Sequence, residues 1–233
     1  MALILNLETA TTVCSVSLAN DGVLLSLKEQ NGDYSHAENL TLFIENVLEQ
    51  ANVKLSDIDA IAVSKGPGSY TGLRIGVSVA KGLCYALNKP LISVSTLKHI
   101  SLSVSENLKS QGVDVNSFFC PMLDARRMEV YCAFFDSLNN EIKPIAAEII
   151  DEHSFQESLN KNAIYFFGDG AAKCKKELSV NKNAIFIDDV FPSAKNMISF
   201  SEQAFSNKEF EDVAYFEPYY LKDFVAGKKK SKG

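Results

Sequence analysis

Hydrophobic and polar positions alternate along the chain with two different periods, and these periods predict its strands and helices. Short apolar or alternating runs that end at glycine, asparagine or proline are typical of strands, whereas apolar residues at every third or fourth position are typical of helices. The first half of the chain has the predicted order β-β-β-α-β-α-β-α. Its predicted strands cover residues 3–8, 12–19, 23–29, 60–64 and 91–94, and its predicted helices cover 37–51, 72–87 and a segment that begins near 95.

The same order of elements begins again after a polar, irregular stretch at about residues 108–117. The second half has predicted strands at 118–124, 129–135, 142–149, 163–167 and 184–187, and predicted helices at 154–160, 171–178 and 193–206. Strand pairs mixed with crossover helices are typical of α/β lobes, in which helices pack on a mixed sheet. The sequence therefore predicts an α/β protein with two lobes that share one order of elements.

This repeat sets the expected domain boundaries. We expect a first lobe at residues 1–107 and a second lobe at residues 108–210. The C-terminal segment at 211–226 is expected to pack back on the first lobe. Residues 227–233 carry Lys228, Lys229, Lys230 and Lys232. They are expected to form a disordered basic tail, because charge runs at a terminus are usually solvated.

The predicted helix at 72–87 is apolar on two sides. At about 100° per residue, one wide face is expected to pack on the sheet; it contains Leu73, Gly76, Val77, Ala80, Leu83, Cys84 and Leu87. A second apolar stripe contains Ile75, Val79, Gly82 and Ala86, and a narrow polar strip contains Arg74, Ser78, Lys81 and Tyr85. A helix of this kind is covered by more than one neighbour, which is either another part of the chain or another subunit.

Composition and charge narrow the range of partners. The 233 residues are 46% hydrophobic and carry a formal net charge of −6, which argues against independent nucleic-acid binding, because such binding depends on Lys and Arg. No run approaches the roughly 18–20 apolar residues that span a bilayer, and no signal-peptide pattern precedes the first strand, so we expect a cytoplasmic protein. The five cysteines lack C-x-x-C spacing and are expected to be buried hydrophobic residues.

The glycine-rich turn before the helix at 72–87 resembles a phosphate loop only superficially. Its glycines follow the spacing G-x-G-x-x-x-G rather than G-x-G-x-x-G, and the lysine of a Walker loop is missing. Pro67 also lacks an N–H group that a phosphate cradle would use. We therefore interpret Gly66, Pro67, Gly68 and Gly72 as a structural elbow, with nucleotide binding as the weaker alternative.

The first predicted strand of each half ends in an acid, namely Glu8 and Asp124. Such acids could face a cleft between the lobes and hold a phosphate-bound metal through water. Alternatively, they could cap turns or pair with neighbours such as Arg126 or Arg127. Charge alone does not separate these readings.

No pattern in the sequence indicates a catalytic residue or a metal site. His36, His99 and His153 lie far apart, none has a second histidine four residues away, and no G-x-S-x-G elbow is present. His36 precedes the first predicted helix, where we expect it to cap the helix or to face solvent.

Several sequence blocks together resemble the TsaB (YeaZ) family, whose members are needed to make threonylcarbamoyladenosine in transfer RNA. The most specific block is GPGSYTGLRIG at 66–76. The match extends through LNLETA at 5–10, HAENL at 36–40, LDARRMEVY at 123–131, GDGA at 168–171 and PYYL at 218–221.

The resemblance implies an actin-like, sugar-kinase-like fold of two lobes and a non-catalytic role. In that family the protein supports a catalytic paralogue, TsaD, and the complex recruits the ATPase TsaE to transfer a threonylcarbamoyl group to the adenosine next to the anticodon. The paralogue binds metal through a histidine pair, but here Leu40 takes the second position after His36. Glu8 also stands where most relatives have aspartate. These departures imply at most a vestigial phosphate or nucleotide cleft at Glu8, Thr9, Asp124, Gly168 and Asp169.

The resemblance also implies a partner surface on the helices of the first lobe. We expect Arg74, Ile75, Ser78, Val79, Gly82 and Ala86 to contact TsaD, and the same surface to form a homodimer when the chain is alone. Transfer RNA is expected to bind only through the complex. No tightly bound cofactor is expected for the isolated chain, whereas ATP and a divalent metal are expected in the complex. The alternatives are a stand-alone ATP-dependent small-molecule kinase and, less favoured, a metallopeptidase.

Overall fold

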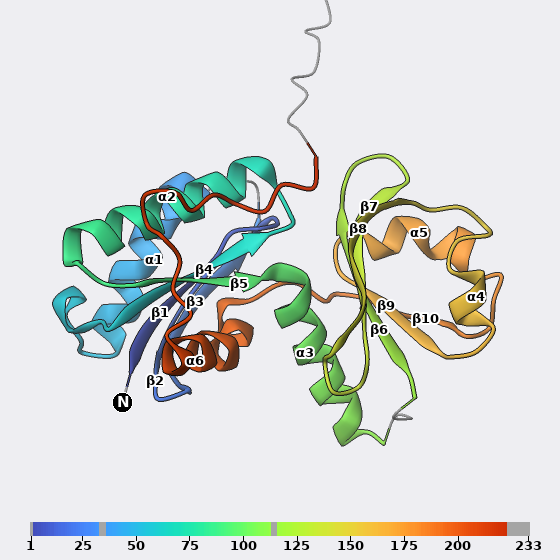
Figure 1. Cartoon of the computed structure of the whole chain (residues 1–233), viewed down its shortest axis with the longest axis horizontal. Helices are drawn as coiled ribbons and strands as arrows, with labels where there is room; N and C mark the ends of the chain where they lie inside the picture. Colours follow the sequence, from blue (N-terminus) through green and yellow to red (C-terminus); the bar gives the residue numbers. More distant parts are fainter. Residues whose placement is uncertain (1, 33–35, 113–115, 223–233) are drawn as a thin grey trace, which may run out of the picture.

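Alternating side chains along ten strands build two five-stranded sheets. The computed structural model describes residues 2–32, 36–112 and 116–222. The first sheet has the strand order β3-β2-β1-β4-β5 and the second has the order β10-β9-β6-β7-β8. Figure 1 shows the two sheets in the two halves of the molecule, side by side along its longest axis. In both sheets one antiparallel meander joins two parallel strands, as expected for mixed α/β sheets.

The strands and helices follow the predicted order in both halves. The first half contains β1 (Leu3–Glu8), β2 (Val13–Asn20), β3 (Val23–Asn31), α1 (His36–Gln50), η1 (Leu55–Asp57), β4 (Ala60–Gly66), α2 (Tyr70–Leu87), β5 (Leu91–Ser95) and α3 (Thr96–Ser110). The second half contains β6 (Phe118–Asp124), β7 (Glu129–Phe135), β8 (Glu141–Ile149), α4 (Gln156–Leu159), β9 (Ile164–Phe167), α5 (Ala171–Leu178), β10 (Ala184–Ile187), η2 (Ala194–Met197) and α6 (Ile198–Asn207). The predicted fold class is therefore confirmed. The predicted helix at 193–206 differs in detail, because its first turn is the 3₁₀ helix η2.

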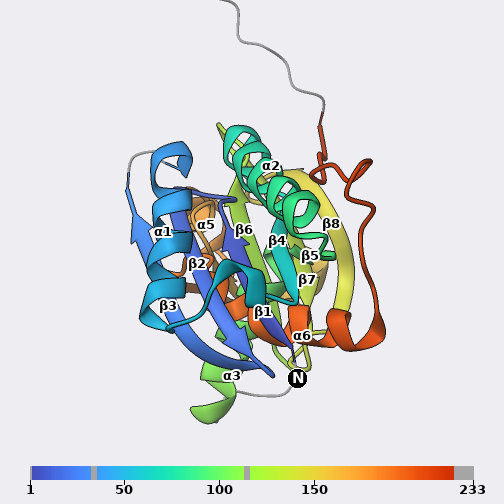
Figure 2. The same cartoon turned by 90° about the vertical axis from the view of Figure 1, so that its left-hand side faces the viewer.

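The first sheet is buried on both faces. Leu5 and Leu7 of β1 point into a core with α1 and α2, whereas Ile4, next to Leu5 in the strand, belongs to a core on the opposite face with η2 and α6. This is the period-two alternation of a strand. Figure 2 shows α1 and α2 together on one side of the sheet.

The second sheet is covered on one face by α4 and α5 and on the other face by α3. Leu97, Ile100 and Val104 of α3 pack with Phe119 and Phe135 of the second sheet. A helix from each half of the chain thus packs on the sheet of the other half: α3 covers the second sheet, and α6 covers the first. The expected lobe boundaries at 107 and 210 do not include this exchange. We propose that the first lobe is formed by two segments of the chain, one that ends near residue 95 and one that begins at about residue 193.

The C-terminal segment returns to the first lobe after α6. The N–H group of Glu211 donates to Leu91 O at 2.8 Å beside β5. Lys81 Nζ on α2 donates to Ala214 O at 3.1 Å and to Phe216 O at 2.9 Å. In Figure 1 this red segment runs over α2 to its described end at residue 222. The expected basic tail at 227–233, like residues 223–226, lies outside the described residues.

The helix α2 ends at the predicted residue but begins at Tyr70 rather than at residue 72, and of its predicted buried face only Leu83 and Leu87 are half-buried rather than buried. Ser69 is its N-cap, with Oγ accepting from Gly72 N at 3.3 Å, and Asn88 ends it in a left-handed conformation. The buried residues of α2 are Gly72, Leu73, Gly76, Val77, Ala80 and Cys84. The five cysteines are buried and free, as expected. Within the described residues, none of the helices is both long and apolar enough for a membrane span.

Candidate functional site

The turn between β4 and α2 packs directly against the turn that follows β1. Ser69 N donates to Ala10 O at 2.6 Å, and Thr9 Oγ1 donates to Gly72 O at 2.8 Å. A Cβ atom at Gly68 would lie 2.3 Å from Ala10 O, and one at Gly72 would lie 2.1 Å from Thr9 O. Only glycine permits so close an approach of two backbones. This packing, with Thr9 as part of it, supports the interpretation of the turn as a structural elbow.

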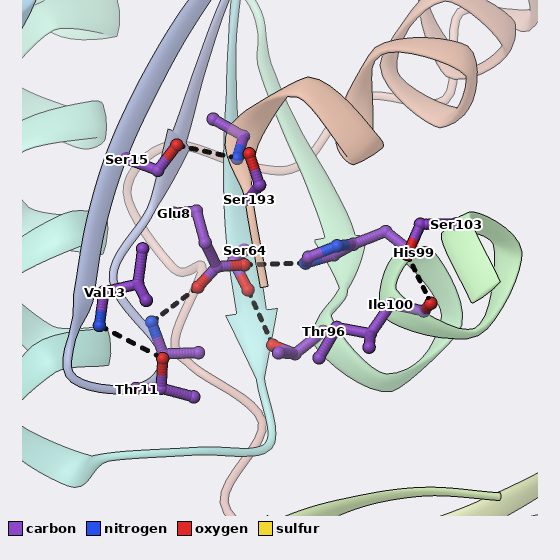
Figure 3. Close-up of polar contacts among 12 residues, drawn as sticks. Glu8, Thr11, Val13, Ser15, Ser64, Thr96, His99, Ile100, Ser103 and Ser193 are labelled. Atoms are coloured by element: carbon purple, nitrogen blue, oxygen red, sulfur yellow. Dashed lines mark hydrogen bonds and ion pairs between the residues drawn. The ribbon is translucent and has the colours of Figure 1, made fainter. Parts of the chain in front are cut away.

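Glu8 is fully buried at the end of β1, and both of its carboxylate oxygens have partners. Oε1 accepts from Ala10 N at 2.6 Å, and Oε2 lies 2.6 Å from Nε2 of His99 on α3. Figure 3 shows the Glu8 carboxylate and the His99 ring pointing toward each other. His99 is also fully buried. Glu8 therefore caps its own turn, which was one of the alternatives, but its side-chain partner is His99 rather than Arg126 or Arg127.

The role of His99 was missed by sequence reasoning. Its position between Leu97 and Ile100 on a predicted helix indicates burial, but the contact of α3 with Glu8 joins residues 91 positions apart and has no local signal. His36 was also misplaced. It does not face solvent, because it is buried with Nε2 2.7 Å from Thr11 O.

Asp124 lies exposed at the end of β6 and is bound by a lysine of α5. Lys173 Nζ pairs with Asp124 Oδ1 and also donates to Glu129 O at 2.6 Å. The Asp124 N–H donates to Asp169 Oδ1 at 3.1 Å, which brings two expected cleft residues together. Of the alternatives that the sequence left open, Asp124 caps its turn, since Arg126 donates its backbone N–H to Asp124 Oδ1 at 3.1 Å, and its ion pair within the described residues is with Lys173 rather than Arg126 or Arg127.

The turn at 168–170 packs tightly on β6. A Cβ atom at Gly168, whose φ is +102°, would lie 2.4 Å from Met122 O. Partial burial raises the pKa of the Asp169 carboxyl to about 6, and the Asp124 carboxylate contributes in the same direction. Two cavities of about 290 and 330 Å³ border α4 of the second lobe, and none of the expected cleft residues lines either.

The exposed side of α2 contains four of the six expected partner-binding residues. Arg74, Ser78, Gly82 and Ala86 are exposed, whereas Ile75 and Val79 are half-buried against the core under α1 and α2. A Cβ atom at Gly82 would meet no atom within 4 Å. The Arg74 guanidinium lies 4.4 Å from the centre of the Tyr70 ring, and its Nε donates to Tyr220 Oη at 3.2 Å.

One large side chain on this surface was missed as a candidate. Tyr85 belongs to the polar strip predicted from the sequence, but it is 87% exposed and lies on the same side of α2 as Gly82. An exposed aromatic residue beside small residues is typical of a protein interface, since Tyr is enriched among residues that dominate binding energy. The surface formed by Arg74, Ser78, Gly82, Tyr85 and Ala86 is called the α2 surface below.

Comparisons with known proteins agree with this fold. The family model of tRNA N6-adenosine threonylcarbamoyltransferase (TsaD) matches residues 31–229. The chain is 31% identical to the tRNA threonylcarbamoyladenosine biosynthesis protein TsaB of Escherichia coli, with 97% of each chain covered. It superposes on YeaZ from Pseudomonas aeruginosa with a TM-score of 0.78, at 26% identity and with 95% and 100% of the two chains covered.

A more distant comparison concerns the fold alone. A putative N-acetylmannosamine kinase from Listeria monocytogenes matches with a TM-score of 0.50 at 10% identity, over 89% of this chain and 100% of the kinase. The expected sugar-kinase-like arrangement of two lobes is therefore confirmed.

Proposed function

The chain belongs to the TsaB family of tRNA threonylcarbamoyladenosine biosynthesis proteins, and from this membership we propose that it is the non-catalytic subunit of a tRNA-modifying complex. In this proposal it binds a TsaD-type catalytic paralogue and supports the transfer of a threonylcarbamoyl group to the adenosine next to the anticodon. A TsaE-type ATPase, ATP and a divalent metal belong to the complex, and transfer RNA reaches the chain only within it. The complex acts in the cytoplasm, where transfer RNA is modified.

The state of Glu8 is the observation that carries the non-catalytic part of this proposal. A carboxylate that holds a metal-bound phosphate needs an oxygen that faces the ligand or its water shell. Both Glu8 oxygens are buried and bonded, one to Ala10 N and one to His99. Asp124, at the matching place in the second lobe, is paired with Lys173. These contacts support a scaffold subunit rather than the alternative, a stand-alone kinase.

The partner-binding part of the proposal rests on the α2 surface. Gly82 and Ala86 leave the helix backbone open to close approach by another helix, and Tyr85 beside them offers a large aromatic contact. The C-terminal segment contacts Lys81 and Arg74 on one side of α2 but leaves Gly82 and Ala86 exposed. We propose that the TsaD-type partner covers this area and that a homodimer uses the same area when the partner is missing.

The test is co-elution of the chain with a TsaD-type partner in size-exclusion chromatography. Ala86→Glu places a charge in the α2 surface and is expected to abolish co-elution while leaving the thermal unfolding temperature unchanged. The same substitution at Ala172, an exposed position of α5, is the matched control and is expected to co-elute normally. Val79 is less suitable for substitution, because it is half-buried against the core. Normal co-elution of a folded Ala86→Glu variant would rule out the α2 surface as the binding site for the partner.

A further inference from the structure

The tight turn between β6 and β7 holds two successive arginines in the left-handed region of backbone conformation. Arg126 has φ +70° and Arg127 has φ +49°. Ala125 N donates to Glu129 O, and Glu129 N donates to Arg126 O, both at 3.1 Å, so the turn is closed by backbone hydrogen bonds. Glycine and asparagine adopt this conformation at lower cost than arginine does. Two strained residues that persist in a tight turn point to a use for their side chains.

The acids on either side of these arginines are already bound by lysines from distant parts of the chain. Asp124 pairs with Lys173 of α5, and Glu129 pairs with Lys222 of the C-terminal segment. Figure 1 shows the described end of that segment next to the β7 end of the second sheet. The lysines therefore neutralise the carboxylates that would otherwise pair with the arginines.

Both arginines are exposed, and their guanidinium groups are available. Among residues 2–32, 36–112 and 116–222, neither guanidinium has an ion pair, a side-chain hydrogen bond or an aromatic ring against it. Arg74, the third arginine of the chain, is by contrast held by Tyr70 and Tyr220. The turn thus presents two adjacent, unpaired guanidinium groups on a chain whose net charge is −6.

We propose that Arg126 and Arg127 bind the phosphate backbone of the RNA on which the complex acts. A guanidinium group is planar and matches the oxygens of a phosphate through two parallel hydrogen bonds. Two of them side by side fit a ligand that repeats its negative charge, which a nucleic-acid backbone does. The proposed protein partner is assigned to the α2 surface of the first lobe, whereas this turn belongs to the second sheet. The inference rests on the proposed function, because it requires RNA in the complex.

The test measures RNA binding by two assembled complexes, one that contains the wild-type turn and one that contains a variant of it. Arg126→Asn combined with Arg127→Gly removes both guanidinium groups and supplies residues that adopt the left-handed conformation more easily. We expect affinity for transfer RNA to fall at least tenfold. We also expect the slope of log Kobs against log salt concentration to become shallower by roughly 0.7–0.9 for each lost phosphate contact. The thermal unfolding temperature is expected to stay the same or to rise.

A control variant removes two charges elsewhere in the second lobe. Lys176→Gln combined with Lys182→Gln changes two exposed lysines, and its complex is expected to bind RNA with the affinity and salt slope of the wild type. The inference is overturned if the variant of the turn also keeps that affinity and slope. It is equally overturned if the variant no longer co-elutes with the TsaD-type partner, because the arginines would then contact protein.

This experiment separates the inference from the proposed function. If transfer-RNA modification requires the wild-type chain while the variant of the turn binds RNA as the wild type does, only the inference fails. If modification proceeds equally well without the chain, the proposed function itself fails.

Discussion

At the scale of single residues, the contact between Glu8 and His99 decides what the end of β1 can do. The sequence leaves open that this carboxylate holds a phosphate-bound metal, but in the structure it is buried and points at an imidazole from α3. A buried polar group costs free energy unless it is hydrogen-bonded, and both Glu8 oxygens are. Glu8 is therefore bound to α3, the helix that also packs on the second sheet.

Removal of His99 should show how strongly this contact holds the fold. His99→Ala leaves a buried Glu8 oxygen without its hydrogen-bond partner, and an unsatisfied buried polar group costs about 1–3 kcal/mol of unfolding free energy, or more where the group is charged. Urea denaturation followed by circular dichroism measures this loss. His153→Ala is the control, since His153 is 73% exposed, and it should change stability little. A loss below about 1 kcal/mol for His99→Ala would mean that the pair is not a structural contact.

Asp169 gives the structure a pH dependence of its own. The folded state raises the pKa of this carboxyl to about 6, above its ordinary value near 3.8, chiefly through burial. Between these pH values the folded chain keeps a proton that the unfolded chain has lost, so the contribution of Asp169 to stability falls as pH rises from about 4 to 6. Part of the residue remains exposed, which limits the size of the effect.

Asp169→Asn should therefore stabilise the protein at neutral pH and not at acid pH. The amide cannot ionise, while its oxygen can still accept from Asp124 N. Thermal unfolding at pH 4 and pH 7 measures the difference between variant and wild type. We expect the advantage of the variant to be present at pH 7 and to shrink toward pH 4; an equal difference at both pH values would contradict this assignment of the pKa.

At the scale of elements, two glycines of α2 have opposite surroundings. Near its start, Gly72 lets the helix approach the backbone of Thr9. In its second half, Gly82 faces open space. One glycine therefore serves packing inside the lobe and the other leaves room outside it.

Alanine at these two positions should change stability in opposite directions. Gly72→Ala forces a Cβ atom against Thr9 O and should cost about 1–3 kcal/mol, as overpacked cores do. Gly82→Ala meets no neighbour and should gain about 0.5–1 kcal/mol from helix propensity. Chemical denaturation of both variants measures the two changes. Stabilisation by Gly72→Ala would contradict the close contact between the elbow and β1.

The elements that the sequence predicts well are those with a local pattern. Periodicity and turn residues predict the strand at 118–124 and the helix at 171–178 with the bounds that the structure has. The interpretation of the turn before α2 as an elbow follows from the glycine spacing and Pro67. The Glu8–His99 and Asp124–Lys173 contacts do not follow, because they join residues 91 and 49 positions apart, and no local rule encodes such distances.

At the scale of the whole molecule, the two halves are coupled by exchanged helices. The helix α3 follows a strand of the first sheet but packs on the second sheet, whereas η2 and α6 follow a strand of the second sheet but pack on the first. The order of elements alone assigns each helix to its neighbours in sequence, which is why the expected boundaries at 107 and 210 miss this arrangement. The C-terminal segment adds a further link, since it borders α2 and reaches Glu129 through Lys222.

The central claim is that this chain acts by binding its catalytic partner rather than by chemistry of its own. The most direct measurement is the yield of threonylcarbamoyladenosine in transfer RNA in a reconstituted reaction. The reaction contains TsaD-type and TsaE-type proteins, ATP, a divalent metal and threonylcarbamoyl-adenylate, with this chain added as wild type, Ala86→Glu or Ala172→Glu, or omitted. We predict full yield with wild type and Ala172→Glu, and the background yield of the omitted reaction with Ala86→Glu. Equal yield with and without the chain would contradict the account.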